Sequence, residues 1–219
     1  MNESKKLTLQ EIFTLAIQNH QKKEFQVAEN FYKEVLKIDP NHSNTYYNLG
    51  KLFDELEQYQ KAIDCYERTT KIDPNDANAH YNLGNIFRKL KQYQKAKICY
   101  EKVIKIDHNY SNAYNALGAV FSSLQEQKKA MSYFEKAVEI NPDNASACYN
   151  LGNLLQKFGA NQKAKIYFEH ALHKYPNDRN FCVSYGKLLL ALNKHAIGLG
   201  YISKGIGVIV LKKSGPKII

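Results

Sequence analysis

Four segments of the sequence decide its fold: YYNLGKLFDEL from Tyr46, HYNLGNIFRKL from His80, YNALGAVFSSL from Tyr114 and CYNLGNLLQKF from Cys148. Successive segments begin 34 residues apart. The period continues after each segment, where alanine recurs at one position and an aromatic residue four positions later. A fixed period of roughly 20 to 50 residues is typical of repeat proteins, so the chain is predicted to consist of tandem copies of one small structural unit.

Each copy is predicted to form two amphipathic helices joined by a short turn. Apolar or small residues fall at positions 4, 7, 8 and 11 of the period and again at 20, 24 and 27, which is the spacing of one helix face. A glycine inside a helix costs about 1 kcal/mol relative to alanine, so its recurrence at position 8 indicates a close helix approach. A proline near the end of most copies ends the second helix. The recurring glycines are Gly50, Gly84, Gly118, Gly152 and Gly186.

This pattern resembles the tetratricopeptide repeat family, whose signature combines an aromatic and a Leu-Gly pair, an Ala-x3-aromatic segment and a closing proline over 34 residues. The resemblance implies an all-α fold, a right-handed α-solenoid of helix-turn-helix repeats. We expect residues 1–8 to form an N-terminal lead-in and residues 213–219 a basic C-terminal tail. The terminal repeats depart from the pattern, as capping units of a solenoid do. The predicted repeats are 9–42, 43–76, 77–110, 111–144, 145–178 and a degenerate capping repeat, 179–212.

The net charge of +10 is concentrated at one end of the chain. Residues 1–178 contain 24 Lys plus Arg against 21 Asp plus Glu, whereas residues 179–219 contain 7 against none. We interpret the cationic end as a solvated cap that discourages end-to-end stacking, with docking to an acidic partner or a membrane as the alternative. Nucleic-acid binding is not expected, because the aromatic residues occupy core positions and do not interleave with exposed cations.

The sequence also predicts where the protein resides. No apolar run is long enough to span a bilayer, so no transmembrane segment is expected. The lysines near the N-terminus are followed by a segment that Gln10, Glu11 and Gln18 interrupt, unlike the continuous apolar core of a signal peptide. A cytoplasmic protein is therefore expected.

Cysteine and histidine placement argues against catalysis and metal binding. Cys65 and Cys99 share one repeat position, and Cys148 and Cys182 share another, which favours free buried thiols in a reducing compartment over disulfides. His170 lies three residues before His173 on one predicted helix, but no further ligand follows at a suitable spacing. Because the repeats occupy residues 9–212 and no catalytic motif occurs, we predict a protein that is not an enzyme and that holds no cofactor or metal.

The resemblance implies that the first helix of each repeat lines a concave groove through positions 2, 5, 6, 9, 12 and 13. Asparagine recurs at these positions, and a side-chain amide can both donate to and accept from the backbone of an extended peptide. The strings Tyr81–Asn85 and Tyr149–Asn153 resemble the repeats of O-linked N-acetylglucosamine transferase, where an asparagine ladder holds the substrate peptide. The residues predicted to line the peptide-binding groove are Asn48, Lys51, Asn82, Asn85, Arg88, Asn115, Asn150, Asn153, Lys157 and Lys187.

The sequence allows alternative interpretations of the site and of the function. Asparagine at position 2 either caps the first helix or contacts the partner. The leading hypothesis is a protein–protein interaction scaffold that binds an extended segment with some acidic residues. The alternative is an accessory or targeting module, as a subunit or fragment, of a glycosyltransferase or oxygenase system. Self-association through the ends of the array also remains open.

Overall fold

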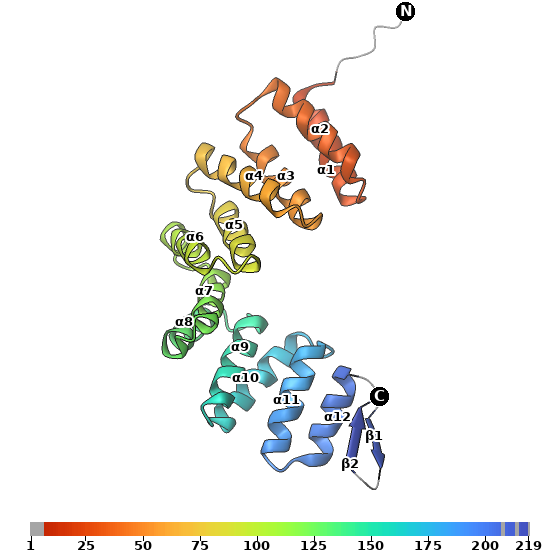
Figure 1. Cartoon of the computed structure of the whole chain (residues 1–219), viewed down its shortest axis with the longest axis vertical. Coiled ribbons are helices and arrows are strands. Elements are labelled where there is room, and N and C mark those ends of the chain that lie inside the picture. The colour runs from red at the N-terminus through yellow and green to blue at the C-terminus, as the bar shows by residue number, and fades with distance from the viewer. Residues whose placement is uncertain (1–6, 207–208, 213–214, 219) are drawn as a thin grey trace, which may run out of the picture. The chain divides into compact units, whose positions relative to one another are not determined.

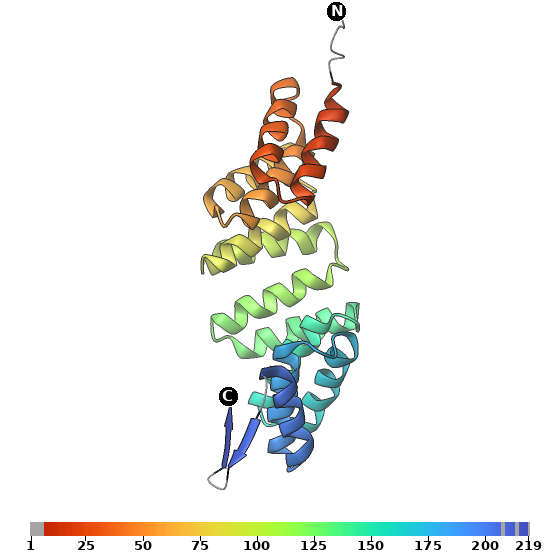
Figure 2. The ribbon, with the colours of Figure 1, turned by 90° about the vertical axis from the view of Figure 1, so that its right-hand side faces the viewer.

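The computed structural model describes residues 7–206, 209–212 and 215–218, and its helices confirm the predicted all-α solenoid of helix-turn-helix repeats. The chain forms two compact units, Met1–Asp107 and His108–Ile219, which we call unit 1 and unit 2. Figure 1 and Figure 2 show that the helices of each unit pack as successive antiparallel pairs. No helix of the described residues is long and apolar enough to cross a membrane.

Unit 1 holds six helices in the residues that the structure describes. They are α1 (Leu9–Gln21), α2 (Phe25–Ile38), α3 (Ser43–Glu55), α4 (Tyr59–Ile72), α5 (Ala77–Lys89) and α6 (Tyr93–Ile106). Unit 2 continues with α7 (Ser111–Ser123), α8 (Gln127–Ile140), α9 (Ala145–Lys157), α10 (Asn161–Lys174), α11 (Arg179–Ala191) and α12 (His195–Ile206).

The core of each helix pair is built on glycine and alanine, as the period indicates. Ala130 of α8 is fully buried against α7. A Cβ atom on Gly118 would lie 2.5 Å from the ring of Phe134, closer than non-bonded carbon atoms can approach. In repeats 2 to 5 position 8 is therefore glycine because the aromatic ring at position 24 occupies the space that a side chain would need.

The turn inside each repeat contains a residue with a left-handed backbone conformation, which the sequence pattern does not predict. Position 15 has a positive φ in every repeat, at Lys23, Glu57, Lys91, Gln125, Gly159 and Asn193. The left-handed residue turns the chain so that the following backbone N–H can donate to a free carbonyl of the last helical turn. In the second repeat the backbone N–H of Gln58 donates to the carbonyl oxygen of Phe53 at 2.8 Å. Five of these six residues are not glycine, which makes the left-handed position hard to find from composition.

The N-terminal caps correct one hypothesis about position 2. The first helices begin one residue before position 2, and their caps are at position 34 of the preceding repeat. The side chains of Asp76, Asn144 and Asp178 accept hydrogen bonds from the backbone N–H three residues later. Position-2 asparagines such as Asn112 lie inside their helices, so the capping interpretation of position 2 was wrong.

The C-terminal segment contains strands that the repeat pattern does not predict. Strands β1 (Ile209–Lys212) and β2 (Gly215–Ile218) pair antiparallel, with Ile209 opposite Ile218. α12 ends at Ile206, so β1 falls within the range assigned to the sixth repeat. The side chains beyond residue 206 lie outside the described part of the chain, and the proposed role of this end as a cationic cap stays a prediction.

Candidate interaction site

The predicted groove residues are divided between the two units. Asn48, Lys51, Asn82, Asn85 and Arg88 lie on α3 and α5 of unit 1. The remaining five lie on first helices of unit 2: Asn115 on α7, Asn150, Asn153 and Lys157 on α9, and Lys187 on α11. All four lysines and arginines of this set are exposed, whereas the six asparagines are half-buried.

The asparagines are half-buried partly because some of them form hydrogen bonds to the neighbouring repeat. Nδ2 of Asn82 donates to the hydroxyl of Tyr47 at 3.2 Å, and Nδ2 of Asn150 donates to Oδ1 of Asn115 at 2.9 Å. Ser184 makes the same kind of bond, from its hydroxyl to that of Tyr149 at 3.2 Å. In every case position 6 of one repeat bonds to position 5 of the preceding repeat. These asparagines therefore stabilise repeat stacking, whatever else they bind.

Most of the other asparagines also have intramolecular partners. Oδ1 of Asn85 accepts from the hydroxyl of Tyr100 at 2.8 Å, and Nδ2 of Asn48 donates to the carbonyl of Asn44 at 2.7 Å. Asn153 differs, because its side-chain amide has no hydrogen bond to any residue that the structure describes. Among the predicted groove asparagines, Asn153 is therefore the one whose amide is wholly available to a partner.

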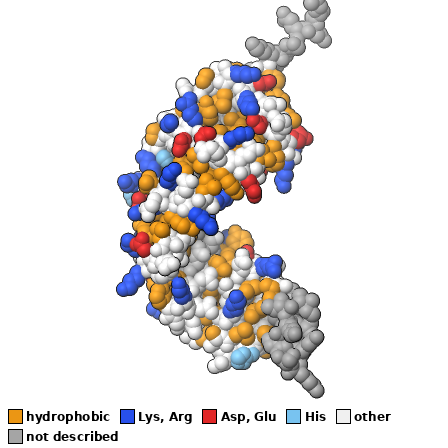
Figure 3. All heavy atoms as spheres, in the orientation of Figure 1, with side chains coloured by type: hydrophobic (Ala, Val, Ile, Leu, Met, Phe, Trp, Pro, Cys, Tyr) orange, Lys and Arg blue, Asp and Glu red, His pale blue; other side chains and the backbone are white. Residues whose placement is uncertain are grey.

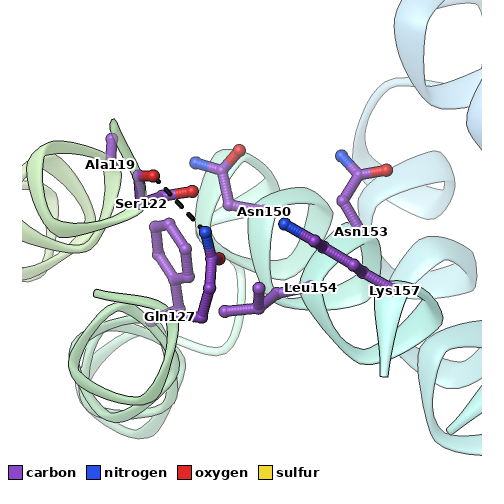
Figure 4. A pocket seen from close by; sticks show the side chains of 8 residues that line it. Ala119, Ser122, Gln127, Asn150, Asn153, Leu154 and Lys157 are labelled. Carbon is purple, nitrogen blue, oxygen red and sulfur yellow. Dashed lines mark hydrogen bonds between the residues drawn. The ribbon is translucent and has the colours of Figure 1, made fainter. Parts of the chain in front are cut away.

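Unit 2 brings three of the predicted residues into one pocket of about 290 Å³ (Figure 4). α9 forms one side of it and the α7–α8 pair the other, and Lys157 and Gln127 point into it from opposite sides. Nε2 of Gln127 lies 3.5 Å from the carbonyl of Ser122, and its buried Oε1 has no hydrogen-bond partner among the described residues. The lining residues are Ala119, Ser122, Gln127, Phe134, Asn150, Asn153, Leu154 and Lys157.

A second pocket, of about 240 Å³, lies in unit 1 and includes Asn48 and Lys51. The buried ring of His20 forms part of its wall, with Nε2 3.3 Å from Oε1 of Glu55 and Nδ1 3.5 Å from the hydroxyl of Tyr32. Burial raises the pKa of Tyr32 to about 12, so this phenol stays protonated and neutral. This pocket thus places a carboxylate beside the predicted amide and lysine.

His20 is expected to titrate below its ordinary pKa of 6.5, because the cost of burying the charged ring exceeds the attraction of Glu55, and Lys51 adds repulsion. The unfolded chain then takes up this proton at a higher pH than the folded chain. The stability that His20 contributes is present above the unfolded pKa and is lost as the pH falls through the folded value. An NMR titration of the His20 ring measures this directly, and a pKa at or above 6.5 would show that Glu55 dominates.

The four cysteines lie outside these pockets, and burial raises the pKa of each thiol. All four cysteines are free, as predicted, although Cys65 is only partly buried. Burial raises the pKa of Cys65 and Cys99 to about 12, which keeps these thiols protonated and poorly nucleophilic. His170 and His173 are exposed, and no cluster of three His, Cys, Asp or Glu side chains suited to a metal occurs in the described residues.

Two polar residues of the unit 2 pocket and one buried helix cap are absent from the predicted set. Ser122 and Gln127 of unit 2 line a pocket: Ser122 is at groove position 12 but was not among the predicted residues, and Gln127 is at position 17, which is not a groove position. Asn144 is the buried cap of α9, and its Nδ2 lies within 2.9 Å of both the Ser111 hydroxyl and Oδ1 of Asn112. A residue-by-residue comparison of the repeats is the signal that could have identified Ser122 and Gln127, because both differ in type from their counterparts two repeats earlier.

Family models and solved structures both match the chain. Models of the tetratricopeptide repeat match residues 9–38, 31–64, 53–89, 77–110, 111–144 and 133–166. The chain in a crystal structure of MamA has 30% sequence identity to this protein, with a TM-score of 0.66. The match covers 74% of this chain and 95% of the MamA chain. No curated protein sequence matches.

Two further structures share the fold at lower identity. PilF of Pseudomonas aeruginosa is 19% identical, with a TM-score of 0.79 over 88% of each chain. YrrB, described as a tetratricopeptide repeat protein with an unusual peptide-binding site, is 22% identical over 80% of this chain and 90% of its own, with a TM-score of 0.60. The 34-residue period, the glycine–aromatic packing and these matches together show that the chain belongs to the tetratricopeptide repeat family.

Proposed function

We propose that this protein is a non-enzymatic interaction scaffold that binds an extended segment of another protein on the first helices of its repeats. Membership of the tetratricopeptide repeat family supports a role in protein interaction. The observation that carries the proposal is the pocket of unit 2, where Asn150, Asn153 and Lys157 converge with apolar and polar side chains. Pockets that combine apolar walls with a few polar groups are typical binding sites.

The amides of the pocket retain the capacity to bind a peptide backbone. Each asparagine amide has two N–H donors and a carbonyl acceptor. Asn150 donates to Asn115 and keeps a second N–H, and Asn153 keeps its whole amide. Two such groups one helical turn apart can each bond to a peptide group of an extended segment without selecting its side chains.

Charge favours a segment with acidic residues. Unit 2 contains 14 Lys plus Arg against 6 Asp plus Glu, whereas unit 1 contains 17 against 15. On the face in Figure 3, acidic side chains lie mostly over unit 1. Exposed Lys157 and Lys187 add positive charge to the first helices of unit 2. Complementary charge of this kind speeds association and helps to select the partner.

Asn153→Ala is the sharpest test of the proposed function, because it removes an amide without breaking an intramolecular bond. A peptide of about twelve residues selected from a display library on the wild-type protein serves as the probe. Loss of one neutral hydrogen bond, worth about 0.5–1.5 kcal/mol, should weaken its binding roughly two- to tenfold in a calorimetric titration. The free energy of unfolding should stay within about 0.5 kcal/mol of the wild-type value.

The matched control is His170→Ala, a substitution of an exposed residue on α10, the second helix of the same repeat. It should leave affinity unchanged. If library selection yields no peptide above background, or if Asn153→Ala binds the peptide as tightly as the wild type does, this site does not bind an extended segment in the way proposed.

A further inference from the structure

Successive repeats meet at a three-residue corner, formed by positions 12 and 17 of one repeat and position 13 of the next. In the first corner, His20 at position 12 lies 5.9 Å from the ring of Phe25 and 3.3 Å from the carboxylate of Glu55. The charge is reversed in the second corner, where the Lys89 ammonium lies 2.6 Å from Oδ1 of Asp54. Both corners of unit 1 thus pair an ionisable group at position 12 with one of the opposite type at position 13.

The aromatic residue at position 17 completes the corner. Nζ of Lys89 lies 5.5 Å from the centre of the Tyr59 ring, within the range of a cation–π contact. Lys89 is therefore held by a carboxylate and an aromatic face, both from the repeat before it.

The equivalent corner of unit 2 lies 68 residues later in the sequence. It retains the lysine but lacks both the carboxylate and the aromatic ring that hold the lysine in unit 1. Lys157 corresponds to Lys89, but Ser122 stands in place of Asp54 and Gln127 in place of Tyr59. Lys157 forms no ion pair, hydrogen bond or cation–π contact with any residue that the structure describes. The lysine that unit 1 neutralises internally is left unpaired in unit 2.

The pocket of unit 2 arises at this altered corner. Ala119, Ser122, Gln127 and Phe134 line it, and each lacks a charge, a ring or a hydroxyl that its counterpart two repeats earlier carries. Those counterparts are Lys51, Asp54, Tyr59 and Tyr66. The other four lining residues, Asn150, Asn153, Leu154 and Lys157, correspond to Asn82, Asn85, Ile86 and Lys89, so this side of the pocket is nearly unchanged.

We propose that this pocket binds the side-chain carboxylate of an Asp or Glu in the bound segment, which takes the place at Lys157 that the Asp54 carboxylate has at Lys89. The inference rests on the proposed function and adds the chemical class that one subsite selects. Nζ of Lys157 and the free amide of Asn153 supply donors, and no Asp or Glu lines the pocket. A charge-assisted hydrogen bond is stronger than a neutral one, so this contact selects for an acidic residue.

A double-mutant cycle tests the pairing with the library-selected peptide. Each Asp or Glu of the peptide is replaced in turn by Asn or Gln, and its affinity for the wild type and for Lys157→Gln is measured by calorimetry. We expect one acidic position whose neutralisation weakens binding about tenfold in the wild type and less than twofold in Lys157→Gln. Lys89→Gln, which removes the already paired lysine of unit 1, is the matched control and should leave that tenfold effect in place.

Grafting the corner of unit 1 into unit 2 gives a second, independent variant. Ser122→Asp with Gln127→Tyr should pair Lys157 internally, fill the pocket and abolish the preference for the acidic residue while the helices stay folded by circular dichroism. The proposed subsite is wrong if the peptide binds in an Asn153-dependent manner without coupling to Lys157. It is also wrong if replacing the acidic residues shows no coupling to Lys157→Gln, and the only peptide change that does is amidation of the C-terminus or replacement of an aromatic residue. Failure to select any peptide contradicts the proposed function itself.

Discussion

Phe168→Ala is expected to lower the free energy of unfolding by about 3–5 kcal/mol, the range for a deleted buried aromatic side chain. The ring is fully buried in unit 2. It packs against the backbone of Gly152, where an added Cβ would lie 3.0 Å from the ring, and its centre lies 6.0 Å from that of Tyr149 and 6.5 Å from that of Tyr185. Because these contacts come from α9 and α11, the two helices that pack against α10, the remaining structure cannot close the cavity by moving one side chain.

Urea unfolding followed by circular dichroism measures the loss. Phe158→Ala, in the same repeat, is the control, because this ring is 55% exposed and its removal should cost no more than about 0.5 kcal/mol. Equal effects of the two substitutions would show that the position-24 aromatic does not anchor the repeat. Hydrogen exchange should show the largest loss of protection in α9 and α10, since a repeat array responds mainly through nearest neighbours.

Periodicity predicts the helices well because each repeat has to bury the same faces. Every second helix begins at position 17 and the first five end at position 30, so the second helix of each repeat follows from the alanine and aromatic pattern alone. The buried Ala130 and the crowded Gly118 are where the spacing of small residues places them. Local spacing is sufficient here because the contacts of a hairpin join residues that are close in the sequence.

Features that depend on backbone conformation were harder to predict. Lys23, Glu57 and Gln125 adopt a left-handed conformation that their residue types do not favour, because the closing hydrogen bonds of the helix end require it. The caps at position 34 were missed because asparagine at position 2 is a good capping residue by type but lies two residues after the cap, inside the helix. Strands β1 and β2 have no counterpart in the repeats, so periodicity offers no signal for them.

The sequence places several candidate residues on one helix face but does not indicate how their side chains are bonded. Asn150, Asn153 and Lys157 share a pocket, as their common helix face implies. Two of the hydrogen bonds join residues of different repeats, from Asn82 to Tyr47 and from Asn150 to Asn115. The repeat period in the sequence does not determine the distance between neighbouring repeats in space. Those contacts depend on tertiary packing, which explains why asparagines predicted to bind a partner also hold the repeats together.

Gly186→Ala is expected to open the last helix pair, at a cost of about 2–3 kcal/mol. A Cβ atom on Gly186 would lie 2.7 Å from the backbone carbonyl oxygen of Gly198 and 2.6 Å from Cγ1 of Ile202. A Cβ on Gly198 would in turn lie 2.8 Å from the carbonyl oxygen of Gly186. In the repeat of Gly118 the nearby atoms belong to a side chain, whereas here α11 and α12 meet backbone to backbone, so the helices must separate.

Gly200→Ala on the same α12 is the matched control, because nothing lies within 4 Å of the Cβ that it adds. Alanine is the better helix former, so this substitution should raise stability by up to about 1 kcal/mol. Hydrogen exchange should therefore show less protection of α12 in Gly186→Ala and more in Gly200→Ala. In the described residues α12 packs mainly against α11, so it has little other support once that contact loosens. Equal protection in the two variants would mean that the close approach of Gly186 and Gly198 does not hold the last repeat together.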